Sequence, residues 1–180
     1  MMVRWLGMIL LPLFACQTVY KVPVKDWDVS ASDNLVQCKA AISRMEAGIE
    51  KIILSKVKKE ALLETEKVLS NFNKITSPLQ FYSYVHPDKS IRDASKKCEM
   101  LCEKAQLKVF LRKELYEAIR TDEALSYDNE EVMLYDDYIK AFLNNGINLS
   151  QKNKEKFGNL KKRLITLSND FSATLTAWKS

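Results

Sequence analysis

Residues 157–178 have the sequence FGNLKKRLITLSNDFSATLTAW. Large apolar side chains recur in this segment every three or four residues, which is the spacing of one face of an α-helix. These side chains are Phe157, Leu160, Leu164, Leu167, Phe171, Leu175 and Trp178. We therefore predict a long helix that begins after Ser150 as its N-cap and turns this stripe inward as a core seam.

The same spacing predicts helices nearer the N-terminus. Ser30-Ala31-Ser32-Asp33 has the S-x-x-D form of a capping box, and apolar residues follow it at helical spacing from Leu35 to Val57. A second helix is expected from about Glu60 to Phe72, continuing in some form beyond Pro78 through an aromatic cluster.

Turn signals separate the remaining helices. The segment His86-Pro87-Asp88-Lys89-Ser90 should end one helix and begin the next, because proline fits the first helical turn and disfavours helix in the residue before it. That next helix is predicted to extend to Ile119 or Arg120, and another to cover 130–144. Asn145-Gly146-Ile147 then has the form of a glycine C-cap followed by an apolar contact.

Composition agrees with a helical chain. The 180 residues include only four Gly and four Pro, and no stretch alternates apolar and polar residues long enough to predict a strand. We predict an all-α domain over residues 24–180, an array of about five long antiparallel helices. The last predicted helix runs almost to Ser180 without a stop signal, which suggests a chain truncated before a further domain.

Residues 1–23 form a separate leader. Arg4 precedes an apolar run from Met8 to Ala15 that resembles a short secretory h-region, although the run is too short to cross a bilayer. Cys16 follows Leu13-Phe14-Ala15, which is similar to a bacterial lipoprotein cleavage site. The leader is either a genuine signal or anchor or an unusual start to the gene model, and the residues leave both interpretations open.

Charge argues against a nucleic-acid-binding domain. The formal net charge is +5, and residues 150–180 hold seven Lys and Arg against Glu155 and Asp170, so the rest of the chain is balanced. A nucleic-acid interface would instead show a broad basic face. The run Lys161-Lys162-Arg163 lies between leucines at helical spacing, and we interpret it as a solvated helix face.

The residues for a hydrolytic centre are missing. A catalytic zinc ion needs three protein ligands, and His86, the only histidine, cannot supply a His-Glu-x-x-His pair. A serine or cysteine nucleophile would also depend on His86 as its base, and we predict a solvent-facing or capping role for that residue. Glu130 and Glu131 are expected to interact favourably with the positive, N-terminal end of a helix dipole. We predict no catalytic, cofactor-binding or metal-binding residue in this chain.

The four cysteines are Cys16, Cys38, Cys98 and Cys102. Cys98 and Cys102 are one helical turn apart and should share a face. We expect them to pack as small residues rather than to form a metal or redox site, because only His86 is available to join them. Removal of the leader would leave three cysteines, an odd number that favours a reducing compartment.

Several segments, in order along the chain, resemble the N-terminal region of the thimet oligopeptidase and neurolysin family of zinc metallopeptidases. Five motifs of that family have counterparts in this chain. They are a tryptophan-led opening, an "SPxKxIRxAS" segment, a "REDVY" element, an "NGLxL" turn and an "IKKRLSxLxxDFxxNL" helix. These counterparts are Trp27–Ala31, His86–Ser95, Arg112–Tyr116, Asn145–Leu149 and Leu160–Leu175.

The resemblance implies the N-terminal helical portion of a cytoplasmic zinc metalloendopeptidase that hydrolyses short peptides. The helices would form one wall of a deep channel, and the zinc-binding His-Glu-x-x-His would lie beyond this chain, in a catalytic domain that is its partner. No catalytic residue carries over, so the chain alone should be inactive.

Two other hypotheses remain open. The chain could be a non-catalytic helical module that binds peptides or proteins and is secreted or membrane-tethered through its leader. It could also be a helical scaffold unrelated to peptidases.

Overall fold

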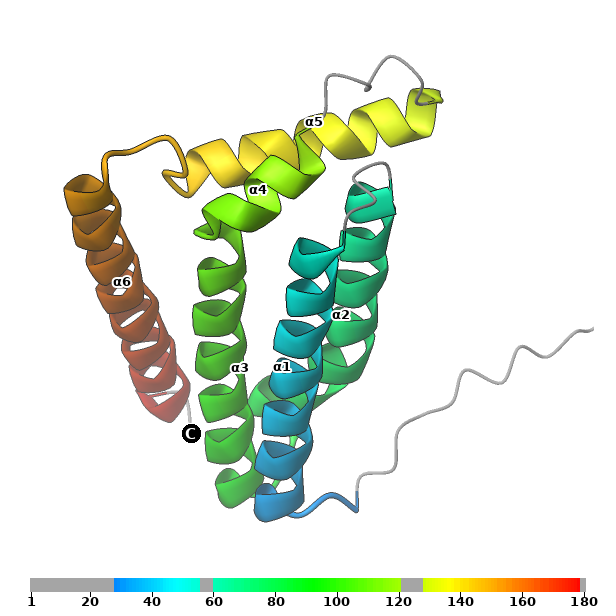
Figure 1. Ribbon diagram of the computed structural model, residues 1–180. Coiled ribbons are helices and arrows are strands. Elements are labelled where there is room, and N and C mark those ends of the chain that lie inside the picture. Colours follow the sequence, from blue (N-terminus) through cyan, green and yellow to red (C-terminus); the bar gives the residue numbers. More distant parts are fainter. Residues whose placement is uncertain (1–27, 56–59, 121–127, 179–180) are drawn as a thin grey trace, which may run out of the picture.

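The computed structural model describes residues 28–55, 60–120 and 128–178, so the predicted leader at 1–23 lies outside the described residues. The described part contains six α-helices and no strand (Figure 1). The prediction of an all-α chain is confirmed, with five long helices and one short one. The helices are α1 (Ala31–Leu54), α2 (Ala61–Val85), α3 (Lys89–Phe110), α4 (Lys113–Ile119), α5 (Asn129–Asn144) and α6 (Gln151–Trp178).

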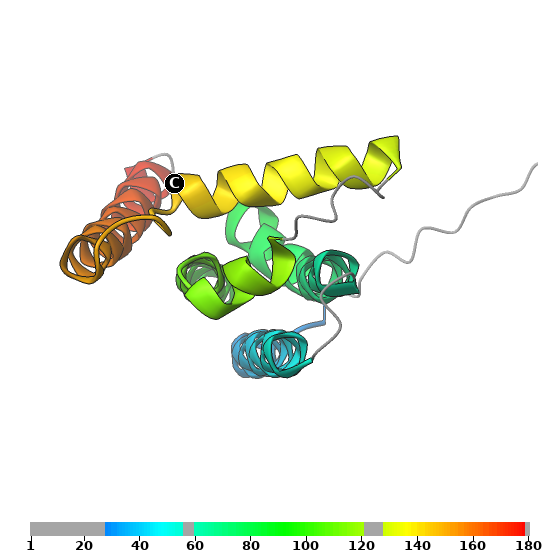
Figure 2. The same cartoon turned by 45° about the horizontal axis from the view of Figure 1, so that its top comes forward.

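Helices α1, α2 and α3 pack against one another as a three-helix bundle in which α2 runs antiparallel to both α1 and α3 (Figures 1 and 2). Helix α4 turns across one end of this bundle, and α5 lies over that end beyond α4. Helix α6 then returns along α3, with which it makes its main contacts. The bundle is thus covered at one end by α4 and α5 and flanked on one side by α6.

Polar side chains cap the starts of α1, α3 and α5. The hydroxyl of Ser30 accepts a 3.0 Å hydrogen bond from the backbone N–H of Asp33, and α1 starts at Ala31, directly after Ser30. In the turn after α2, the carboxylate of Asp88 accepts a 2.7 Å bond from the N–H of Ser90. Asp128 and Glu131 form a reciprocal capping box at the start of α5, which places Glu131 in a structural role.

The predicted glycine C-cap of α5 is also confirmed. Gly146 has a φ of 79°, the left-handed region that favours glycine. Its N–H donates to the carbonyl of Leu143, and the N–H of Ile147 donates to the carbonyl of Phe142, which is the hydrogen-bond pair of a Schellman motif. Ile147 is buried, as its expected apolar contact requires.

The helix predicted to run from the turn at His86–Ser90 to Ile119 or Arg120 is correct up to Phe110 and wrong beyond it. Helix α3 ends at Phe110, and Arg112 adopts an extended conformation before α4 begins. The break has a tertiary cause, because a straight continuation would carry Leu115 and Ile119 past the end of the bundle. The bend instead buries both side chains completely. In contrast, α2 does continue through Pro78 as predicted.

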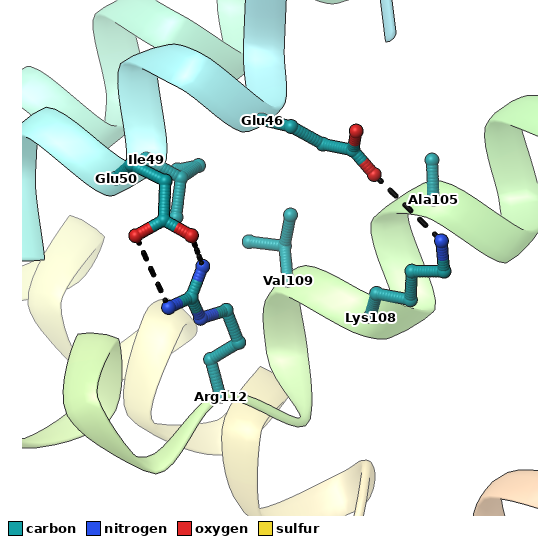
Figure 3. Close-up of a pocket in the computed structure, with 7 residues that line it drawn as sticks. All are labelled: Glu46, Ile49, Glu50, Ala105, Lys108, Val109 and Arg112. Atoms are coloured by element: carbon teal, nitrogen blue, oxygen red, sulfur yellow. Dashed lines mark hydrogen bonds and ion pairs between the residues drawn. The ribbon is translucent and has the colours of Figure 1, made fainter. Parts of the chain in front are cut away.

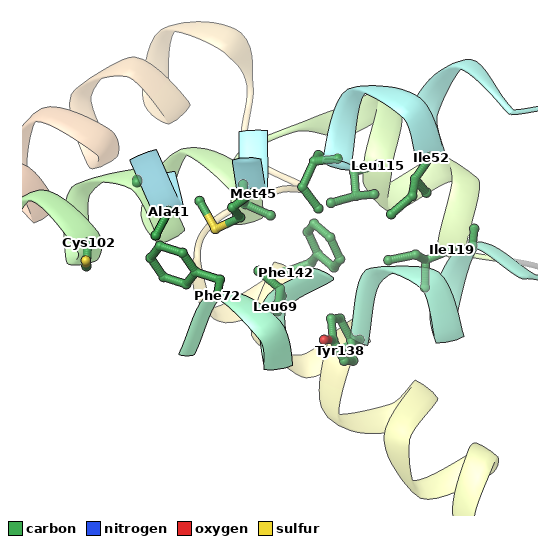
Figure 4. Packing of buried hydrophobic residues seen from close by; sticks show 14 of the residues in the cluster. Ala41, Met45, Ile52, Leu69, Phe72, Cys102, Leu115, Ile119, Tyr138 and Phe142 are labelled. Carbon is green, nitrogen blue, oxygen red and sulfur yellow. The ribbon is translucent and has the colours of Figure 1, made fainter. Parts of the chain in front are cut away.

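Aromatic rings join the bundle to the helices that cover its end. Phe142 of α5 is fully buried, and its ring makes edge contacts with Phe110 at 5.2 Å and Tyr116 at 5.4 Å between ring centroids. Figure 4 shows Phe142 surrounded by apolar side chains from the bundle and from α4. A single hydrophobic core therefore runs from the interior of the bundle to α5.

The predicted inward orientation of the α6 stripe is wrong within this chain. Helix α6 turns Ile165 and Asn169 toward α3, and the amide of Asn169 donates to the carboxylate of Glu103 at 3.0 Å. Phe157 is half-buried, and the side chain of Trp178 lies outside the described residues. The rest of the stripe is exposed: Leu160 57%, Leu164 60%, Leu167 55%, Phe171 65% and Leu175 43%. Periodicity identified the apolar face correctly but could not show what covers it.

Candidate functional site

Three buried cysteines meet between α1 and α3. Cys38 of α1 forms a disulfide with Cys98 of α3. The Cys102 Sγ lies 3.6 Å from the Cys38 Sγ and 3.9 Å from the Cys98 Sγ. We call Cys38, Cys98 and Cys102 the three-cysteine cluster. Cys98 and Cys102 share a face as predicted, but the expectation that they pack only as small residues is wrong, because Cys38 joins them from 60 residues away.

The environment of Cys102 holds its thiol in the protonated form. Burial raises its pKa to about 11, and the nearby Glu103 and Glu99 carboxylates act in the same direction. Hydrogen bonding to Gln80 and Thr76 opposes this effect without cancelling it. Since the thiolate is the nucleophilic form, Cys102 is a weak nucleophile at neutral pH despite its nearness to the disulfide.

The odd cysteine count led to the expectation of reduced cysteines, and the structure instead pairs two and leaves the third as a thiol. The number of cysteines was misleading because it does not show which of them lie close enough to pair. The packing of α1 alongside α3, with the two helices running in the same direction, decides which sulfurs meet.

His86 has a structural role. It is the C-cap residue of α2, and its Nδ1 accepts a 3.0 Å hydrogen bond from the backbone N–H of Asp88. Its ring stands edge-on to Tyr82, and only 7% of the residue is exposed. The capping part of the prediction is therefore confirmed and the solvent-facing part is wrong. Among the described residues, the one group of side chains able to hold a metal ion contains cysteines alone, so His86 does not join it.

A shallow pocket of about 240 Å³ lies between α1 and α3 (Figure 3). Its charges are compensated. The guanidinium of Arg112 pairs with the carboxylate of Glu50, and the Lys108 Nζ lies 3.7 Å from the Glu46 Oε1. The hydrogen bond from Arg112 holds the pKa of Glu50 below its usual value. A carboxylate that stays ionised against a paired arginine is unsuited to proton transfer at neutral pH, so this pocket is a structural ion-pair site.

A second hollow, of about 380 Å³, lies between α3 and α6. Its lining combines apolar side chains such as Leu107 and Ile165 with polar groups such as Gln106 and Lys161. The exposed α6 stripe borders it, because Leu164 contributes to both surfaces. This side of the molecule therefore offers exposed apolar side chains together with a concave surface.

The segments that resemble the oligopeptidase family occupy structural junctions. His86–Ser95 forms the turn from α2 into α3, Arg112–Tyr116 forms the break between α3 and α4, and Asn145–Leu149 joins α5 to α6. Leu160–Leu175 carries the exposed stripe. Of the fifth segment, Trp27 lies outside the described residues.

Comparison of the sequence with models of known protein families gives no match. Among the described helices, none has the length and apolar character needed to cross a membrane.

Proposed function

We propose that this chain is the N-terminal helical portion of a zinc metalloendopeptidase of the thimet oligopeptidase family, which hydrolyses short peptides. The exposed stripe of α6 is the observation that carries the proposal. Isolated apolar side chains are common on protein surfaces, but a continuous apolar helix face usually marks an interface. Five large side chains on one face, each 43–65% exposed, suit packing against a further domain of the same enzyme.

The size of the stripe supports this assignment. Full burial of one leucine or phenylalanine side chain is worth about 1.5–3 kcal/mol relative to exposure. Five partly exposed side chains of this kind therefore represent several kcal/mol of association energy. The stripe also lies within the segment of α6 that most resembles the family, and the other matched segments shape the helix junctions that set the position of α6.

Zinc chemistry would come from the catalytic domain of the same enzyme. A hydrolytic zinc ion polarises the scissile carbonyl and activates a water molecule. The described residues do not fit that ion: His86 is engaged as a helix cap, and two of the three sulfurs of the three-cysteine cluster are joined in a disulfide. We therefore assign this chain a supporting role, as part of the wall that admits short peptides, and no role in the chemical step.

Peptidase activity of the endogenous product tests the proposal. The protein is isolated from its native source with an antibody against this chain and incubated with an internally quenched peptide of oligopeptide length. We expect cleavage that a zinc chelator abolishes and added zinc restores. A folded protein that carries the same cleavage sequence in a structured region should remain intact. Recombinant 180-residue chain is the negative control, and an inactive endogenous product contradicts the proposal.

A non-catalytic binding module is the second candidate function. The continuous core from the bundle to α5 favours it, because such a core allows this chain to fold by itself. The hollow between α3 and α6 would then be the binding surface. Under this alternative the recombinant chain binds short peptides, intact peptide is recovered after incubation, and Leu164→Glu weakens binding.

The compartment is a separate part of the proposal. The family resemblance supports the cytoplasm, whereas a leader that acts as a signal would direct the protein to the secretory pathway or to a membrane. The disulfide favours the second alternative, because disulfides persist mainly in oxidising compartments. N-terminal sequencing of the endogenous protein separates the two: a product that keeps residues 1–15 supports the cytoplasm, and one that begins at Cys16 or later supports export.

A further inference from the structure

The three-cysteine cluster contains one sulfur, that of Cys102, in addition to the two that form the disulfide. Two helices bring three Sγ atoms within 4.8 Å of one another, and each of the three residues is buried. The Cys102 Sγ sits beside both sulfurs of the disulfide rather than beside one of them. A disulfide needs two cysteines, so the position of the third requires its own explanation.

We propose that the reduced three-cysteine cluster is a binding site for one Cu(I) ion held by the sulfurs of Cys38, Cys98 and Cys102. Soft thiolate ligands select thiophilic ions such as Cu(I) and zinc. Zinc in a closed structural site takes four ligands, whereas the group found among the described residues offers three sulfurs and no histidine or carboxylate. Cu(I) accepts three thiolates in a plane and needs no fourth ligand, so it suits a buried site with three sulfurs.

The spacing of the sulfurs fits this geometry. After reduction, the Cys38 and Cys98 sulfurs separate to van der Waals contact, and the Cys102 sulfur already lies 3.6 and 3.9 Å from them. The centre of such a triangle is about 2.2 Å from each sulfur, close to the ~2.3 Å of a metal–thiolate bond. An ion can therefore sit between the sulfurs with little movement of α1 against α3.

Reduction must come first, and its balance is simple. A dithiol reductant gives two electrons and two protons to the Cys38–Cys98 disulfide, yields two thiols, and becomes a cyclic disulfide itself. The incoming Cu(I) ion then replaces a proton on each thiol that it binds, and those protons pass to solvent. The oxidised cluster cannot hold the ion, so occupancy depends on the redox state.

The test uses the full chain, reduced and free of oxygen, with Cu(I) supplied as its acetonitrile complex in competition with a Cu(I)-specific chelator. We expect one Cu(I) per chain and an X-ray absorption spectrum with three sulfur neighbours. Cys102→Ser should lower the affinity at least tenfold and reduce the sulfur count to two. This variant keeps the Cys38–Cys98 pair, and a circular dichroism melt under oxidising conditions verifies that it folds.

Cys16→Ser is the matched control, because it removes a thiol from the leader and leaves the cluster intact. It should bind Cu(I) as the unaltered chain does. The proposal is overturned if no stoichiometric Cu(I) binding occurs, if Cys102→Ser binds equally well, or if the reduced chain takes up one Zn(II) in preference to Cu(I).

Discussion

At the level of single residues, Cys102 shows how burial decides the behaviour of a reactive group. Its sulfur lies 3.6 and 3.9 Å from the two sulfurs of a disulfide, which is close enough for contact with both. Burial nevertheless raises its pKa to about 11, so the thiolate is scarce at neutral pH. The fold thus keeps a third sulfur close to the disulfide in an unreactive form.

This shift predicts a dependence of stability on pH. The pKa of Cys102 rises from 9.0 to about 11 on folding, so the protonated thiol is favoured in the native state. Its contribution is therefore complete below about pH 9 and is lost as pH rises toward 11. Urea unfolding at pH 8 and pH 10.5 should show a larger loss of stability in the unaltered chain than in Cys102→Ala. Equal losses in the two proteins contradict the assignment.

Asn34 is a second residue whose position matters. Its side chain is fully buried, and its Nδ2 donates to the Leu79 carbonyl at 3.0 Å and to the Ser95 hydroxyl at 3.1 Å. One amide thereby connects α1 to both α2 and α3.

We expect Asn34→Ala to lower the free energy of unfolding by about 1–3 kcal/mol, because it removes two buried hydrogen bonds and leaves the Leu79 carbonyl without this donor. Chemical denaturation measures the change. Asn71→Ala, at an exposed position of α2, is the control and should stay within about 0.5 kcal/mol of the unaltered chain. Similar losses for both variants would show that the interhelical bonds contribute little.

At the level of helices and turns, the sequence predicted where helices begin and end better than it predicted where the chain bends and which helix faces are buried. Ser30, the turn at His86–Ser90 and Gly146 act through local chemistry that a few neighbouring residues contain, and the structure confirms each of these predictions. The break at Arg112 has no glycine or proline to announce it. It exists because Leu115 and Ile119 gain burial and Arg112 reaches Glu50, which is 62 residues away, and such causes are invisible to local patterns.

The turn between α5 and α6 allows a matched pair of glycine substitutions. Gly146→Ala should destabilise the chain by about 1–2 kcal/mol, because a side chain disfavours the left-handed conformation. The new Cβ would also lie 2.7 Å from the Leu149 Cδ1. Gly158→Ala, inside α6, meets its nearest atom at 3.4 Å and should be neutral or stabilising by up to about 1 kcal/mol. Thermal melts that rank the two variants in the opposite order would contradict this description of the turn.

The exposure of the α6 stripe predicts that substitutions there have little effect on the stability of the isolated chain. In the isolated chain, Leu164→Glu combined with Phe171→Glu should change stability by less than about 1 kcal/mol, since both side chains already contact solvent. Leu115→Glu is the contrast and should prevent folding, because Leu115 is completely buried. Circular dichroism melts give the comparison. A double variant that unfolds would mean that the stripe is packed within this chain after all.

At the level of the whole molecule, sequence reasoning identified the all-α class and most helix boundaries but not the three-cysteine cluster. Cys38 appears in the sequence as one apolar position of a helix face, and nothing local links it to Cys98. The link comes from the parallel packing of α1 on α3, which depends on the tertiary fold. The exposure of the α6 stripe could not be predicted either. The spacing of apolar residues identifies the apolar face of a helix but does not show which other element packs against that face.

The α6 stripe is the feature of the whole molecule on which the proposed function depends. A bundle with its own core supports a helix whose apolar face is uncovered, and the segments that resemble the oligopeptidase family set the path of the chain to that helix. Under the proposed function, the stripe is the junction between this helical portion and a zinc-bearing catalytic domain.

The intact mass and peptide map of the endogenous protein, captured through an antibody against residues 31–54, test this account most directly. We predict a product larger than the 20.7 kDa of this chain, whose additional peptides include a His-Glu-x-x-His sequence. An endogenous product that ends at Ser180 and contains no such sequence would contradict it.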